Sequence, residues 1–195
     1  VLNRVLRHDI RNDMNVIVAW GEMLEDEVTP EGKEKLERIL RAGRHVVELT
    51  NVARDLSALI HGDETPDRKP ISLRQILSEE LEKRRETFSD AEIMMPDPPD
   101  PGTYVLANEL LSSVFRNLVN NAVQHNRTAQ PKVMITVEDD VESVRVRVAD
   151  NGPGIPDDVK KDLFREGEKG LESGGTGMGL FLVDSLVEGY GGDVW

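Results

Sequence analysis

The sequence contains no cysteine, which excludes disulfides and thiolate metal sites. Its longest apolar run, Val16–Trp20, is far too short to span a bilayer, and no signal-peptide pattern is present. Basic residues are scarce: 24 Lys and Arg oppose 37 Asp and Glu, for a formal net charge of −13. Because nucleic acids and anionic lipids bind cationic side chains, this surface disfavours both partners. We expect a cytosolic (cytoplasmic) fragment of one large or two small domains that contacts neither nucleic acid nor membrane.

The acidic excess is uneven along the chain. Residues 1–62 carry nine basic and eleven acidic side chains, so most of the negative charge lies in the remainder. One explanation is an ordinary acidic cytosolic protein. The other is adaptation to a high-salt cytoplasm, which is favoured by arginine being used more often than lysine.

Residues 1–28 and 31–61 are expected to form two long helices, because apolar residues recur in both at three-to-four spacing. Thr29-Pro30 predicts a helix restart, with threonine as the N-cap and proline at the first helical position. The connection is short, so the helices should run antiparallel. Two helices cannot bury both apolar stripes between themselves, and a homodimer that closes a four-helix bundle is the simplest remedy.

A polar, proline-containing linker at residues 63–71 is expected to separate this hairpin domain (1–62) from a second domain (72–195). Alternating apolar residues at 133–137 and 144–148 predict an antiparallel strand pair with one covered face. Helices on one side of a mixed sheet would make the second domain an α/β sandwich, and the whole chain α+β. The remaining elements expected are helices at 72–88, 109–125 and 177–190, strands at 92–95 and 103–106, and a last strand that begins at 191 and is truncated.

Asp150 is expected to end a strand and to be followed at once by a Gly-Pro-Gly turn. Glycine lets the backbone approach a flat ligand, and the carboxylate can accept a hydrogen bond from an adenine amino group. Asn-Gly after a strand is also typical of a plain hairpin turn. Pro153 and Pro156 disfavour that alternative, because a returning strand would need their missing N–H groups.

Asn117 and Asn121 lie four residues apart, and so on one face of the expected helix. Their amide oxygens suit Mg²⁺, which keeps several waters and takes few protein ligands when phosphates supply the rest. The alternative is that both are solvated surface residues. They interrupt the apolar side of the helix, which favours the binding interpretation.

The run Gly175-Thr-Gly177-Met-Gly179-Leu180 opens the last expected helix. Glycine N–H groups and the helix dipole together form a site suited to phosphates, although a flexible surface loop is the simpler alternative. No lysine follows the glycines, which excludes a P-loop. Their spacing of i, i+2 and i+4 also differs from a dinucleotide-binding fingerprint.

These motifs resemble the N, G1, F and G2 boxes of the GHKL ATPase superfamily, at Asn117–Ala122, Asp150–Ile155, Phe164 and Gly175–Leu180. Residues 7–12, Arg-His-Asp-Ile-Arg-Asn, resemble the H box of sensor histidine kinases of two-component systems. The resemblance implies a GHKL (Bergerat) ATP-binding domain with ATP and Mg²⁺ as cofactors. Its implied nucleotide-binding residues are Asn117, Asn121, His125, Asp150, Gly152, Gly154, Ile155, Phe164, Gly175, Thr176, Gly177, Gly179 and Leu180.

By this resemblance Asn121 would hold Mg²⁺, His8 would receive the γ-phosphate, and Asn12 would position water for dephosphorylation. Asp9 is the matching candidate for a general base, although residues i and i+1 do not face each other on a helix. The phosphoryl group would pass to an aspartate on a response-regulator receiver domain. The sequence departs from the family pattern at Asp13, where a proline is usual, and at Gln124, where a lysine is frequent.

The residues around His8 give it a separate argument. Arg4, Arg11 and Asn12 share its helical face, which makes a cationic patch able to receive a phosphate beside a side chain that is largely neutral near physiological pH. Two alternatives to a kinase stay open: a conformational GHKL ATPase and a nucleotide-sensing dimeric scaffold. Against the first, the position where those ATPases carry a water-activating glutamate is occupied by Asn117.

Overall fold

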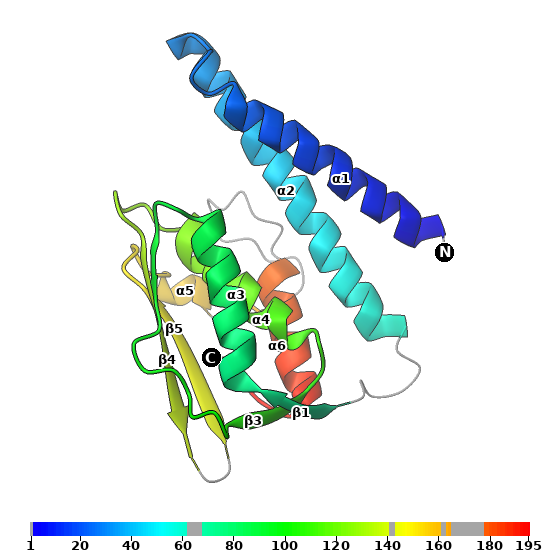
Figure 1. The fold of residues 1–195 in the computed structure, drawn as a ribbon, viewed down its shortest axis with the longest axis vertical. Helices are drawn as coiled ribbons and strands as arrows, with labels where there is room; N and C mark the ends of the chain where they lie inside the picture. The colour runs from blue at the N-terminus through cyan, green and yellow to red at the C-terminus, as the bar shows by residue number, and fades with distance from the viewer. Residues whose placement is uncertain (1, 62–67, 141–142, 161–162, 165–177) are drawn as a thin grey trace. The chain divides into compact units, whose positions relative to one another are not determined.

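The first part of the chain forms two antiparallel helices, α1 (Leu2–Met23) and α2 (Pro30–His61) (Figure 1). The computed structural model describes residues 2–61, 68–140, 143–160, 163–164 and 178–195. These residues divide into two units, the helical hairpin and the chain from residue 68 onward. In the described part of the chain, no helix combines the length and apolar character needed to cross a bilayer.

Close packing in the hairpin depends on two glycines. A Cβ at Gly21 would lie 2.5 Å from Leu40 Cδ2, and one at Gly43 would lie 2.8 Å from Val18 Cγ2. The helices can approach this closely only because neither glycine has a side chain. Leu40 is fully buried at this contact, and Gly21 and Gly43 are buried with it.

The turn between the helices confirms one expectation and corrects another. As expected, α2 begins at Pro30, and the Gly32 N–H donates to Thr29 Oγ1 at 3.3 Å. The first helix, expected to reach residue 28, ends at Met23. Residues 24–27 form turns instead, and three of these four residues are acidic. Negative charge opposes the helix dipole at a C-terminus, which gives a physical reason for the early end.

The second unit contains a three-stranded mixed sheet of β2 (Glu92–Met94), β4 (Lys132–Asp139) and β5 (Val144–Asp150). β2 runs parallel to β4, whereas β4 and β5 are antiparallel, with Val133 opposite Asp150 and Asp139 opposite Val144. The antiparallel pair and the mixed sheet were both expected from the sequence.

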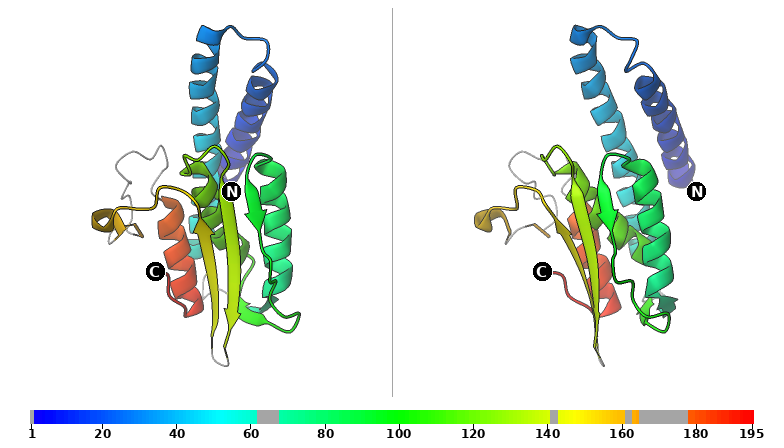
Figure 2. Two further views of the ribbon diagram at one scale, coloured as in Figure 1. Left: turned by 90° about the vertical axis from the view of Figure 1, so that its left-hand side faces the viewer. Right: turned by 60° about the vertical axis from the view of Figure 1, so that its left-hand side comes forward.

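Three helices cover this sheet from one side: α3 (Leu73–Thr87), α4 (Leu111–Gln124) and α6 (Met178–Tyr190) (Figures 1 and 2). α4 lies in the middle and contacts α3, α6, β4 and β5. A fourth, short helix, α5 (Asp157–Lys160), was not expected from the sequence. The core between helices and sheet is apolar, and its fully buried members are Leu73, Leu77, Leu81, Val119, Val133, Ile135, Leu182, Val183 and Leu186.

Two ends of this unit differ from the sequence interpretation. Residues 69–71, expected in the linker, belong to β1 (Lys69–Ser72), which pairs antiparallel with β3 (Tyr104–Ala107); residues 62–67 lie outside the described part. The partner strand is more than 30 residues away, so local composition could not reveal the pairing. The prediction of a strand that begins at Gly191 is wrong. Gly191 (φ +86°) and Gly192 instead donate to Glu188 O and Val187 O, and so end α6.

Candidate functional site

Asn117 of α4 is buried, which overturns the alternative of a solvated surface residue for this position. Its side chain is 5% exposed, and its Nδ2 donates to the Ser113 main-chain oxygen at 2.7 Å. This bond fixes the amide, so that Oδ1 is the atom left to face neighbouring groups. Asn121, one turn later, is half-buried. The two asparagines therefore occupy one side of α4, as expected from their spacing.

Gly179, in the first turn of α6, lies against this asparagine. A Cβ at position 179 would stand 2.9 Å from Asn117 Oδ1. Any larger residue would displace the amide or the helix start, so glycine is required here by a specific contact. Leu180 follows it and is half-buried. Gly175, Thr176 and Gly177, the remaining members of the expected phosphate-binding run, lie outside the described residues.

Asp150 is the last residue of β5, and its carboxylate is held by the turn that follows. The Gly152 N–H donates to Asp150 Oδ1 at 2.7 Å. A Cβ at Gly152 would lie 2.6 Å from that oxygen, and Gly154 has φ +74°, a region that favours glycine. Asp150 is exposed, and its neighbours form an open turn and not a returning strand. The hairpin alternative for Asn-Gly is therefore excluded.

The other predicted binding residues that the structure describes follow α4 or the Asp150 turn along the chain. Ile155, just after the turn, is 46% exposed, which is unusual for an isoleucine and leaves its apolar surface open to solvent. Phe164 is half-buried in a short turn. His125 is exposed at the end of α4, where its main-chain N–H donates to Asn121 O at 3.1 Å.

Two further asparagines that the sequence interpretation missed join α4 to the Asp150 turn. Asn126 Nδ2 donates to Asn151 Oδ1 at 2.7 Å, and Asn151 Oδ1 also accepts the Lys132 N–H at 2.8 Å. Asn126 follows the end of α4, and Asn151 follows Asp150. The only signal in the sequence is their position next to predicted motifs.

The predicted phosphoacceptor residues lie on α1. His8, Asp9 and Asn12 all belong to this helix, and Asp9 and Asn12 are exposed. The side chains of residues 1–8, including His8, lie outside what the structure describes. The spacing of four residues places His8 and Asn12 on one helical face.

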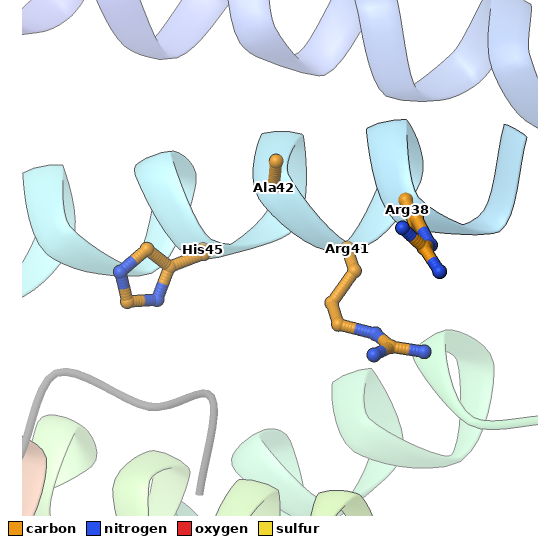
Figure 3. Close-up of a pocket in the computed structure, with 4 residues that line it drawn as sticks. All are labelled: Arg38, Arg41, Ala42 and His45. Carbon is orange, nitrogen blue, oxygen red and sulfur yellow. The ribbon is translucent and has the colours of Figure 1, made fainter. Parts of the chain in front are cut away.

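A second group of basic residues lies on α2. Arg38, Arg41, Ala42 and His45 line a surface pocket, and the side chains of Arg41 and His45 extend to the same side of the helix (Figure 3). Arg38 is paired with Glu34 at 2.7 Å. None of the residues predicted to bind nucleotide or phosphate lines this pocket.

The residues of the second unit fit a nucleotide with its metal ion. A fixed carboxylate suits the adenine amino group, an exposed isoleucine suits the base, and neutral amide oxygens suit Mg²⁺ beside phosphates. The close contact between Gly179 and Asn117 brings the first turn of α6 against the asparagine side of α4, and the dipole of a helix favours anions at its N-terminus. The amide oxygens of Asn117 and Asn121 and the N-terminal end of α6 are therefore groups that suit a polyphosphate with its metal ion.

Comparison with protein families gives two matches. Residues 107–195 match the histidine kinase-, DNA gyrase B- and HSP90-like ATPase family, and residues 2–62 match the His Kinase A (phospho-acceptor) domain. The first match contains all the nucleotide motifs identified above, and the second contains His8.

Characterised relatives are sensor kinases. The chain is 27% identical over 202 residues to the sensor histidine kinase AruS of Pseudomonas aeruginosa, and 25% identical over 201 residues to the signal transduction histidine-protein kinase BarA of Escherichia coli. It is 26% identical over 202 residues to the autoinducer 2 sensor kinase/phosphatase LuxQ of Vibrio harveyi. Each alignment covers 97% of this chain but only 20%, 22% and 24% of the relative, so the chain spans less than a quarter of these proteins.

Solved structures agree with the fold. Full-length ShkA in complex with AMPPNP aligns with 97% of this chain and 41% of that chain, at 24% identity and a TM-score of 0.59. The alignment with the catalytic domain of the histidine kinase ThkA covers 62% of this chain and 80% of the ThkA chain, at 26% identity and a TM-score of 0.53. With an ATP-binding domain of the GHKL type that follows a phospho-acceptor hairpin, the chain belongs to the sensor histidine kinases.

Proposed function

We propose that this chain transfers the γ-phosphoryl group of Mg·ATP to His8 and then to an aspartate of a response-regulator receiver domain. The observation that carries the proposal is that one domain contains both a fixed, exposed carboxylate at Asp150 and a buried, fixed amide at Asn117. The match of the hairpin to a phospho-acceptor domain supplies the second partner in the reaction.

The chain's own residues have separate tasks in this reaction. The Asp150 carboxylate accepts a hydrogen bond from the adenine amino group and so selects the base. Asn121 would hold the Mg²⁺ ion when it is bound, and Asn117, one helical turn before Asn121, would fix the phosphate side of α4. Mg·ATP, when bound, supplies the phosphoryl group, and its Mg²⁺ supplies the positive charge that compensates the negative phosphate oxygens.

His8 is the nucleophile. A neutral imidazole nitrogen forms a bond to the γ-phosphorus as the bond between that phosphorus and the bridging oxygen breaks, and ADP departs with the electron pair. The proton on the phosphorylated imidazole is then released or held by a neighbouring carboxylate, for which Asp9 is the candidate. Positioning and charge neutralisation account for most of the rate.

Dimerisation through the hairpin is part of this proposal. Ile10 and Ile17 lie seven residues apart on α1, and Leu24 follows seven residues later, in the turn just after the helix. They stay 36%, 43% and 43% exposed in the single chain. A stripe of this kind matches the seam of a bundle, because a seven-residue repeat keeps one helix face toward a partner. A second copy of the hairpin would cover it.

Hydrolysis of ATP by an activated water is the weaker alternative. The Asn117 amide donates to Ser113 O and has no basic site with which to take a proton from water. Phosphatase activity toward the regulator remains compatible with the proposal and is assigned to Asn12.

The test is incubation with γ-labelled Mg·ATP. We expect protein-bound label that is acid-labile and base-stable, as a phosphorylated imidazole is. His8→Gln should abolish labelling and keep ATP affinity within about twofold, because the predicted nucleotide residues belong to another domain. His45→Gln, which removes another histidine of the same hairpin, should label normally. Label retained in His8→Gln would contradict the assignment.

A further inference from the structure

Asn126 and Asn151 are joined by a side-chain hydrogen bond. Each of them lies in the chain next to a predicted nucleotide-binding segment. Asn126 Nδ2 donates to Asn151 Oδ1 at 2.7 Å. Asn126 lies two residues after the end of α4, which carries Asn117 and Asn121. Asn151 directly follows Asp150 at the end of β5. The bond therefore joins the segment after the phosphate-side asparagines to the residue after the adenine-side carboxylate.

All four polar atoms of the two amides are used. Asn126 Oδ1 accepts both the N–H and the hydroxyl of Thr128, at 3.0 and 2.7 Å. Asn151 Nδ2 donates to Gln130 O at 3.2 Å, and Asn151 Oδ1 accepts the Lys132 N–H at 2.8 Å. Reversing the Asn126 amide would place its NH₂ against the Thr128 N–H, so the network determines its orientation.

Asn151 also explains how the chain leaves the sheet directly after Asp150. In a regular antiparallel ladder, Lys132 and Asn151 would exchange two main-chain hydrogen bonds. Here the Asn151 N–H donates to Lys132 O at 3.2 Å, but the Lys132 N–H donates to the Asn151 side chain. The side-chain oxygen replaces the main-chain oxygen, and the backbone is free to enter the glycine turn.

The turn fits closely against this network. A Cβ at Gly152 would lie 3.5 Å from Asn126 Cγ as well as 2.6 Å from Asp150 Oδ1. The Gly152 N–H holds Asp150 Oδ1, which assigns Oδ2 to the adenine amino group. A shift of Asn126 or Asn151 would move Gly152, and with it the carboxylate.

We propose that Asn126 and Asn151 are positioning residues for base selection: together they hold Asp150 at a fixed place relative to the asparagine side of α4. Neither residue touches the nucleotide. This inference rests on the proposed role of Asp150 as the adenine reader. A rigid Asp150 carboxylate discriminates adenine from guanine, because a mobile carboxylate could move to accept a hydrogen bond from a guanine donor instead.

The test uses an isosteric substitution. Asn126→Asp keeps the oxygen that accepts from Thr128 but replaces the donor facing Asn151 Oδ1 by a second oxygen. Asn151→Asp is the milder variant, since its oxygens still accept from Asn126 and Lys132, and only the bond to Gln130 O is lost. Gln130→Glu adds the same charge to the same loop and leaves the network intact, because Gln130 contributes only its main-chain oxygen.

The readout is calorimetric affinity for Mg·ATP and Mg·GTP, expressed as the ratio of the two dissociation constants, together with the melting temperature without nucleotide. We expect Asn126→Asp to reduce the preference for ATP by about tenfold, Asn151→Asp to reduce it less, and Gln130→Glu to leave it unchanged. A merely stabilising role would lower the melting temperature but change both affinities by the same factor.

Three outcomes separate the hypotheses. If Asn126→Asp reduces the ratio and Gln130→Glu does not, the positioning role is confirmed. A wild-type preference that persists in Asn126→Asp would overturn the positioning role alone. Equal affinities of the wild type for ATP and GTP would overturn both this inference and the proposed role of Asp150.

Discussion

A Cβ atom at Gly179, in the first turn of α6, would lie 2.9 Å from Asn117 Oδ1 on α4. These residues are 62 positions apart in the sequence, yet each limits what the other can be. The amide of Asn117 is already fixed through Nδ2 to Ser113 O. It cannot turn away from an added methyl group without losing that bond.

Gly179→Ala should therefore weaken Mg·ATP binding by about tenfold, as expected for a strained contact that costs roughly 1–2 kcal/mol. Gly189→Ala is the matched control, because the same substitution in the same helix meets no atom within 4 Å. It should bind ATP normally and melt slightly higher, since alanine favours helix more than glycine does. Calorimetry that gives equal affinities for the two variants would refute the contact's role.

The second prediction concerns the exposed apolar stripe formed by Ile10 and Ile17 of α1 and Leu24 just after it. Ile17→Glu places a charge in the middle of the Ile10, Ile17 and Leu24 row, and should convert a dimer into a monomer at micromolar concentration, because an unpaired charge cannot be buried in an apolar seam. Ala19→Glu adds the same charge on the opposite side of the helix and should stay dimeric. Light scattering gives both masses; a monomeric wild type would exclude dimerisation through this stripe.

The third prediction uses the buried ion pair between Glu80 and Arg84 on α3. Arg84 Nε lies 3.1 Å from Glu80 Oε1, and both side chains are nearly enclosed. Burial raises the pKa of Glu80 above its ordinary value of 4.5, although Arg84 opposes the shift. A raised pKa in the folded state means that Glu80 contributes stability below its ordinary pKa, and that this contribution is lost as the pH rises through the folded pKa.

Glu80→Gln keeps a neutral acceptor in the same place and removes the loss of stability that accompanies ionisation of Glu80. The variant should melt at the same temperature as the wild type below the ordinary carboxyl pKa, and slightly higher at neutral pH. Thermal unfolding of both proteins across this range measures the difference. A variant that is less stable at neutral pH would show that the attraction between Glu80 and Arg84 outweighs the cost of burying the charge.

The fourth prediction follows from the net charge of −13. If this charge reflects adaptation to a saline cytoplasm, added KCl should raise the melting temperature well beyond about 0.5 M, where the Debye length is only a few Å and simple screening is nearly complete. A melting temperature that is already constant above about 0.2 M would favour an ordinary acidic protein.

Local patterns in the sequence predicted the elements whose causes are local. The alternation in β4 and β5, and the Thr29-Pro30 restart of α2, were confirmed because each depends on neighbouring residues. The strand β1 was missed because its partner, β3, lies more than 30 residues away. Local composition at positions 69–72 contains no sign of that pairing.

The candidate site shows the same division. Asp150 and Asn117 could be selected from their motifs, since glycine turns and helical spacing are visible in the sequence. The bond between Asn126 and Asn151 could not, because it joins residues 25 positions apart and depends on how β5 leaves the sheet. The burial of Asn117 against Gly179 also arises from packing of α4 on α6, which no local pattern records.

The last prediction concerns Asn12, which is exposed on α1 one helical turn after His8. Its amide can orient a water molecule near the phosphoaspartate of a docked regulator, but it cannot transfer a proton at neutral pH. Asn12→Ala should leave labelling of His8 nearly intact and slow the dephosphorylation of a receiver domain phosphorylated by this chain by about 10²-fold. Asn15→Ala is the matched control, an exposed asparagine three residues further along the same helix. If Asn12 is only a solvated helix residue, both alanine variants should be slightly more stable and should change neither rate. Equal loss of both rates in Asn12→Ala would instead indicate a folding or docking defect, so measuring labelling and dephosphorylation on the same protein distinguishes the three cases.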